Sequence, residues 1–211
     1  MMAFTLFGNN TKSENSKYKL GFALSLLPAF SVISRMICLY VDGKFTIEES
    51  LPFHLCRAIA LAFPFIMWTR NRKWMSILYF FAVAGTIQAI LTPDLNFSAP
   101  HYEYYCYWLL HVVLFYLPIY CIVVYKIDIQ WKHFFQAIIV SNVFLVVTGI
   151  INLILGSNYF YTSHKPPSPT LLDILGPWPL YIFVVEFMGI LLFFIAFIPF
   201  LLSKKYSAKY S

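Results

Sequence analysis

Six apolar stretches constrain the fold of this chain more than any other feature. They cover residues 20–41, 51–68, 74–92, 105–125, 134–155 and 177–202, and a helix needs roughly 17–25 such residues to cross a bilayer. Runs such as Ile138–Val147 and Phe183–Ile198 do not alternate between apolar and polar residues, as the strands of a membrane barrel would. We therefore predict an all-α fold, a polytopic membrane helix bundle with six transmembrane helices.

The composition supports this class. Charged residues make up 11% of the 211 residues and hydrophobic residues 60%, whereas soluble domains carry about 25% charged residues. A disordered tail and an ordinary soluble domain are therefore excluded. The net charge of +6 does not indicate a nucleic-acid partner, because basic residues in a membrane protein report its orientation.

Basic residues gather at both ends of the chain and on alternate connections between the predicted spans. By the positive-inside rule, both termini and these connections are cytoplasmic, in a multi-pass protein of the cell (plasma) membrane. We expect a cytoplasmic segment at 1–19, a transmembrane domain at 20–202 and a basic tail at 203–211. The basic residues concerned are Lys12, Lys17, Lys19, Arg70, Arg72, Lys73, Lys126, Lys132, Lys204, Lys205 and Lys209.

Every predicted span carries a polar side chain at a similar depth, roughly 5–13 Å below its outer end at a rise of about 1.5 Å per residue. Polar groups inside a membrane are costly, so their positions are informative. We expect them to line one cavity that opens toward the outer leaflet; a polar packing layer without a ligand is the alternative. The residues are Arg35, His54, Arg57, Gln88, Tyr107, His111, Asn152 and Glu186.

The charges in this layer do not balance. Arg35 and Arg57 face a single acid, Glu186, so one arginine is expected to pair with Glu186 and the other to lack an acid. A guanidinium matches a phosphate group in geometry and charge. We therefore expect a membrane phospholipid or lysophospholipid as the partner.

Cys56 is the candidate nucleophile. Ser50 and Pro52 predict a helix that starts just before it, and the positive helix end together with Arg57 would favour a thiolate. His111 at the same depth could accept the thiol proton. The alternative is an inert, buried cysteine. Cys38 and Cys106 could form a disulfide, and we expect no metal or other cofactor, because the His and Cys residues lack ligand spacing.

Several short motifs together resemble one family, the YwaF-like bacterial integral membrane proteins, relatives of the eukaryotic transmembrane protein 164. The resemblance covers about residues 50 to 187, and the ordered set is far more specific than any single motif. The motifs are Leu51-Pro-Phe-His-Leu-Cys56, Gly85-Thr-Ile-Gln88 with Leu91-Thr-Pro-Asp-Leu95, Trp108-Leu-Leu-His111, Asn158-Tyr-Phe-Tyr161, Lys165-Pro166 and Asp173-Ile-Leu-Gly-Pro-Trp-Pro179.

The resemblance implies a bundle of six to seven helices. It also implies an acyltransferase that moves a fatty acyl chain onto a lysophospholipid with a Cys and a His, which would be Cys56 and His111 here. Gln88, Asn152 or a Tyr hydroxyl could then stabilise the oxyanion. Two other classes remain open on the residues alone: a small-solute carrier or substrate-binding membrane subunit, and a structural protein whose polar layer only fixes helix packing.

Overall fold

The computed structural model describes residues 13–93, 95, 97–166 and 171–209, and its regular elements are all helical. The prediction of an all-α fold with six helices is confirmed within these residues. Lys12 and Asp94, which the sequence analysis used, lie outside them. The helices are α2 (Glu14–Val41), α3 (Leu55–Trp68), α4 (Arg72–Leu91), α5 (Tyr102–Val124), α6 (Trp131–Leu155) and α7 (Leu180–Lys209), with two short 3-10 helices, η1 (Tyr159–Tyr161) and η2 (Leu171–Leu175).

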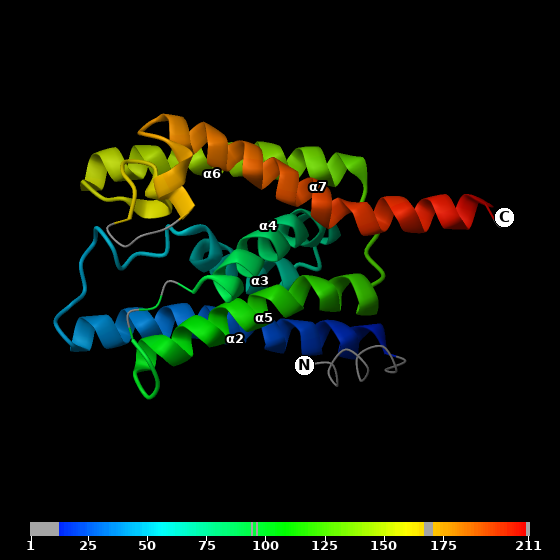
Figure 1. Cartoon of the computed structure of the whole chain (residues 1–211). Coiled ribbons are helices and arrows are strands. Elements are labelled where there is room, and N and C mark those ends of the chain that lie inside the picture. The colour runs from blue at the N-terminus through cyan, green and yellow to red at the C-terminus, as the bar shows by residue number, and fades with distance from the viewer. Residues whose placement is uncertain (1–12, 94, 96, 167–170, 210–211) are drawn as a thin grey trace.

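Helix α4 lies at the centre of three layers. In Figure 1, α6 and α7 form one outer layer, α2 and α5 form the other, and α3 and α4 lie between them. Helix α4 packs against α3, α5, α6 and α7, and its residues from Met75 to Ala82 are all buried. A central helix that is apolar on every face is the arrangement expected for a fully enclosed element.

The outer helices α6 and α7 leave most of their apolar surface uncovered. In the most apolar 18-residue stretch of α6, only 11% is buried inside the bundle, against 56% in the corresponding stretch of α4. Leu153 and Ile154 of α6 are strongly exposed. Such a surface suits contact with lipid tails. Five helices are long and apolar enough to cross a membrane, so the chain is a multi-pass membrane protein.

The second predicted span is shorter than expected. Helix α3 has 14 residues, which at about 1.5 Å per residue reach only about 21 Å, less than a bilayer core of about 30 Å. It begins at Leu55, not at 51, because the hydroxyl of Tyr159 accepts a hydrogen bond from the Leu51 N–H group (3.0 Å). Ser50 does not cap α3 either, since its side chain accepts from the Thr46 N–H group (3.1 Å).

The start of α2 and the end of α7 lie at the same end of the bundle (Figure 1). Arg70, in the turn between α3 and α4, donates to Asn15 near the start of α2 (2.7 Å). Arg72 donates to the backbone oxygens of Tyr125 and Lys126 after α5 (2.9 and 3.0 Å). Several of the basic segments assigned to one side of the membrane therefore meet at one end, which we call the packed end. Their cytoplasmic location stays a prediction.

Candidate functional site

A salt bridge between α2 and α5 lies near the opposite end of the bundle. The Arg35 Nη2 and Nε atoms contact Glu103 Oε2 at 2.8 and 3.0 Å. Glu103 is held at the start of α5, where the His101 side chain accepts from the Glu103 N–H group and caps the helix. The expected pairing of an arginine with Glu186 is wrong, because Arg35 pairs with Glu103 and Glu186 accepts from the Asn142 amide (2.7 Å).

Arg57 lies beside this salt bridge without an acid of its own. It donates to the backbone oxygen of Glu49 (3.3 Å), and the salt bridges found among the described residues do not include it. His54, Arg35 and Glu103 all interact electrostatically with Arg57. Arg57 is therefore a cation that a bound anion could neutralise.

His111 lies near the same cation and has a defined tautomer. Its side chain is 7% exposed, and its Nδ1 atom is 2.9 Å from the backbone oxygen of Tyr107, one turn earlier in α5. Because a carbonyl oxygen only accepts, Nδ1 must carry the proton, which leaves Nε2 as a base. The ring also packs on Tyr107, with centroids 4.2 Å apart, and it interacts electrostatically with Arg57.

Cys56 is the second residue of α3, so the helix starts just before it. His54, the residue before α3, makes no side-chain hydrogen bond to the helix end. The Cys56 sulfur lies against α4 at Gly85, where an added Cβ atom would be 3.8 Å from it. The thiol therefore lies at the uncapped, positive end of α3, next to Arg57.

The loop after α6 packs against the residues just before α3. Gly156 ends α6 in a left-handed conformation (φ 65°), which glycine adopts without steric cost, and the chain turns into η1. The rings of Tyr159 and Tyr161 lie 5.5 and 5.6 Å from that of His54. Burial raises the pKa of Tyr159, so its hydroxyl stays protonated and donates to the Ile47 oxygen (2.6 Å).

Asn152 holds this loop in place. Its Nδ2 atom donates to the Tyr159 oxygen (2.8 Å) and to Thr162 Oγ1 (2.7 Å). Its Oδ1 atom accepts from the Ser157 hydroxyl (2.7 Å) and the Tyr159 N–H group (2.8 Å). The buried amide is fully occupied with the loop, so Asn152 positions Tyr159. Its predicted contact with substrate stays a prediction.

The structure thus gathers part of the predicted polar layer and leaves part of it elsewhere. Arg57 forms one electrostatic cluster with Arg35, His54 and His111. We call this cluster, together with Glu103 and η1, the polar end. Gln88 is exposed on α4, one turn beyond Gly85. Glu186 lies at the contact of α6 with α7. Tyr107 packs on His111 at the polar end, but its hydroxyl donates to the Ala89 oxygen (2.8 Å).

Glu103, Tyr159 and Gly85 were not among the predicted site residues. Two signals could have found them. Gly85 and Tyr159 belong to the quoted motifs, and Glu103 is an acid two residues past His101, at the predicted outer side of the membrane. Long-range pairing of Glu103 with Arg35 is not readable from spacing, because the two residues are on separate helices.

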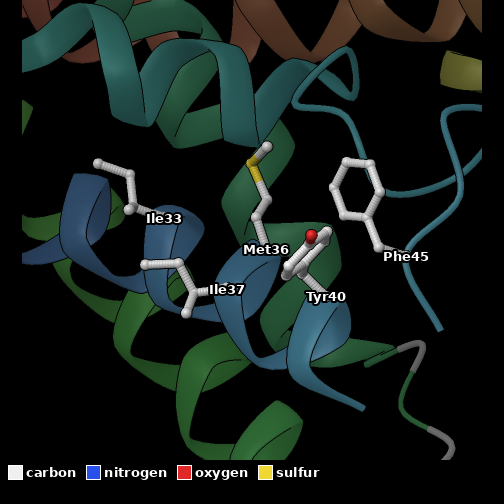
Figure 2. Close-up of a pocket in the computed structure, with 5 residues that line it drawn as sticks. All are labelled: Ile33, Met36, Ile37, Tyr40 and Phe45. Carbon is white, nitrogen blue, oxygen red and sulfur yellow. The ribbon is translucent and has the colours of Figure 1, made fainter. Parts of the chain in front are cut away.

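One apolar cavity lies near the polar end, and a second extends along α3 toward the packed end. The first, of about 330 Å³, lies on the outer face of α2, and Figure 2 shows Phe45 facing Met36 and Tyr40 across it. The second, of about 580 Å³, runs between α3, α4 and α6. Cys38 and Cys106, the possible disulfide pair, are free thiols. No cluster of metal-ligating side chains occurs in the part of the chain that the structure describes.

The fold and this arrangement define a polytopic membrane protein with a charged cluster near one end of its helices. The chain belongs to the TMEM164 family, whose sequence model matches residues 1–197. It is also 26% identical over 173 residues to an uncharacterized protein of Treponema pallidum (strain Nichols), a match that covers 81% of this chain and 71% of the relative. No solved structure matches. The narrower YwaF-like grouping stays a prediction.

Proposed function

We propose that this protein transfers a fatty acyl chain between phospholipids through a thioester on Cys56. The observation that carries the proposal is Arg57, a cation without a salt bridge among the described residues, which interacts electrostatically with the Cys56 thiol on one side and with the buried His111 imidazole on the other. The family membership and the resemblance of the motifs around Cys56 and His111 support the same activity.

The phosphate of a phospholipid would bind Arg57. A phosphate accepts two parallel N–H bonds from one guanidinium, and Arg57 uses only one atom, Nη1, on the Glu49 oxygen. Arg35 is already paired with Glu103, so it contributes to the local potential while Arg57 makes the contact. An anionic headgroup bound here would place the ester bonds of the lipid near the start of α3.

The chemical steps then use Cys56 and His111. His111 Nε2 accepts the thiol proton, the thiolate attacks the ester carbonyl, and the lysophospholipid leaves with the proton from the imidazolium. A second lysophospholipid gives its hydroxyl proton to Nε2 and attacks the thioester, and the thiolate that leaves recovers the proton. The uncapped N-terminus of α3 and Arg57 offset part of the cost of a buried thiolate in both steps.

The test is acyl transfer by the purified full chain in vesicles that contain a labelled phospholipid and a lysophospholipid. Cys56→Ala should lose transfer by at least about a thousandfold, as removal of a catalytic nucleophile does elsewhere. The matched control is Cys38→Ala, at a cysteine on α2, which should transfer like the original protein. Full transfer by Cys56→Ala would refute the thioester route and favour a carrier, which would tolerate that change.

A further inference from the structure

The second cavity begins at Leu55, the residue before Cys56, and runs the length of α3. Leu55, Ala58, Ala62 and Ile66 line it from α3, at the spacing of three or four residues that defines one helix face. Helix α3 has 14 residues and so is about 21 Å long. The cavity is therefore an elongated groove and not a rounded pocket.

Helix α4 forms the second wall of the groove, and Gly85 connects that wall to the thiol. Trp74, Leu78 and Phe81 line the groove from α4, again at the spacing of one helix face. The next position along this face is Gly85, which has no side chain and has the Cys56 sulfur beside it. The missing side chain leaves space beside the sulfur at the end of this wall.

The lining is apolar except at the end near Trp74. There, Thr69 Oγ1 donates to the Phe65 oxygen (2.9 Å) and Asn71 Oδ1 accepts from the Trp74 N–H group (3.2 Å). Phe144 of α6 completes the lining. The polar groups of the lining lie at the end near Trp74, and the remaining lining residues from Leu55 to Ile66 and from Leu78 to Phe81 are apolar, which favours a hydrocarbon chain as the occupant.

We infer that the groove between α3, α4 and α6 binds the acyl chain that is attached to Cys56 during transfer, with the chain end toward Trp74. This inference rests on the proposed function. The groove is about 21 Å long by the rise of α3, against roughly 15 Å for half of a bilayer core. It therefore accommodates a long fatty acyl chain, and its length would limit the length of the chain that is transferred.

The small side chains that line the groove allow this limit on chain length to be tested. Ala62 lies about 9 Å along α3 from Cys56. A phenylalanine there would block the part of the groove toward Trp74 and leave the part next to Leu55 open. Ala62→Phe should reduce transfer of palmitoyl chains by at least about tenfold, the loss expected when two or more methylene groups lose their burial, and should leave octanoyl transfer close to that of the original protein. Ala23→Phe is the matched control, because Ala23 is exposed on α2 outside the groove.

A second measurement does not depend on catalysis. A phosphatidylcholine with a photoreactive group at the end of one acyl chain should crosslink to the α3–α4 turn near Trp74 in Cys56→Ala, and this crosslink should be lost in Ala62→Phe. The inference is overturned if Ala62→Phe keeps the original chain-length profile, or if this crosslink persists in Ala62→Phe. Should the protein transfer no acyl chain at all, the proposed function fails, and the crosslink alone then decides whether the groove holds an acyl chain.

Discussion

The two ends of the bundle use polar groups in opposite ways. At the packed end, the hydroxyls of Tyr120 and Tyr125 both donate to the Lys17 backbone oxygen (2.9 and 3.2 Å), and Tyr18 stacks on Tyr125 with centroids 4.2 Å apart. At the polar end, Arg57 makes no salt bridge and His111 Nε2 makes no hydrogen bond among the residues that the structure describes. The packed end therefore stabilises the fold, and the polar end retains chemistry for a ligand.

The largest expected effect is at the polar end. His111→Gln should reduce acyl transfer by about 10²- to 10⁴-fold, the usual contribution of a general base, while leaving thermal unfolding close to that of the original protein. The measurement is the initial transfer rate in vesicles, with circular dichroism as the check on folding. Transfer at the original rate would remove His111 from the mechanism and reduce the polar end to packing.

The next effect separates charge from shape. Arg57→Ala should lower kcat/KM about 10- to 100-fold, because hydrogen bonds to charged groups contribute about 1.5–3 kcal/mol, mainly through a higher KM for the phospholipid. Arg57→Lys keeps the charge but cannot make two parallel hydrogen bonds to a phosphate. Its kcat/KM should therefore lie between those of Arg57→Ala and the original protein. Equal KM values for all three proteins would contradict a phosphate contact.

A change at the packed end should act on stability alone. A Cβ atom on Gly21 would collide with the Tyr125 hydroxyl and approach Met67 and Tyr120 to 3.0 Å, so Gly21→Ala should lower the free energy of unfolding by about 1–3 kcal/mol. Gly149→Ala is the matched control, since its Cβ atom would meet nothing within 4 Å. It should leave stability unchanged or raise it by up to about 1 kcal/mol.

Thermal unfolding in detergent measures both glycine variants. The transfer rate per folded Gly21→Ala molecule, taken well below its unfolding temperature, should equal that of the original protein. A loss of rate without a loss of stability would show that the two ends are coupled and not separate.

The smallest effect tests a single hydrogen bond at the packed end. Tyr120→Phe removes one donor to the Lys17 oxygen and leaves Tyr125 as the other, so it should cost about 0.5–1.5 kcal/mol of unfolding free energy. The transfer rate should not change. A cost several times larger would mean that the hydroxyl pair acts as one network.

Much of this division was predictable from the sequence, because each helix reports its own apolar length and the depth of its polar residues. The six helices and the gathering of Arg35, Arg57 and His111 follow from that local information. The start of α3 does not, because it depends on Tyr159, far along the chain, accepting from Leu51. The partner of Arg35 was missed for the same reason: a contact between separate helices leaves no spacing in the sequence.

The most direct test of the account is detection of the acyl group on Cys56. Purified protein given a phospholipid donor and no lysophospholipid acceptor should gain the mass of one acyl chain on the peptide that contains Cys56, and hydroxylamine should remove it. Cys56→Ala should gain no such mass. Acyl transfer that proceeds with no acyl group on Cys56, or with the group on Cys38, Cys106 or Cys121 instead, would contradict the account.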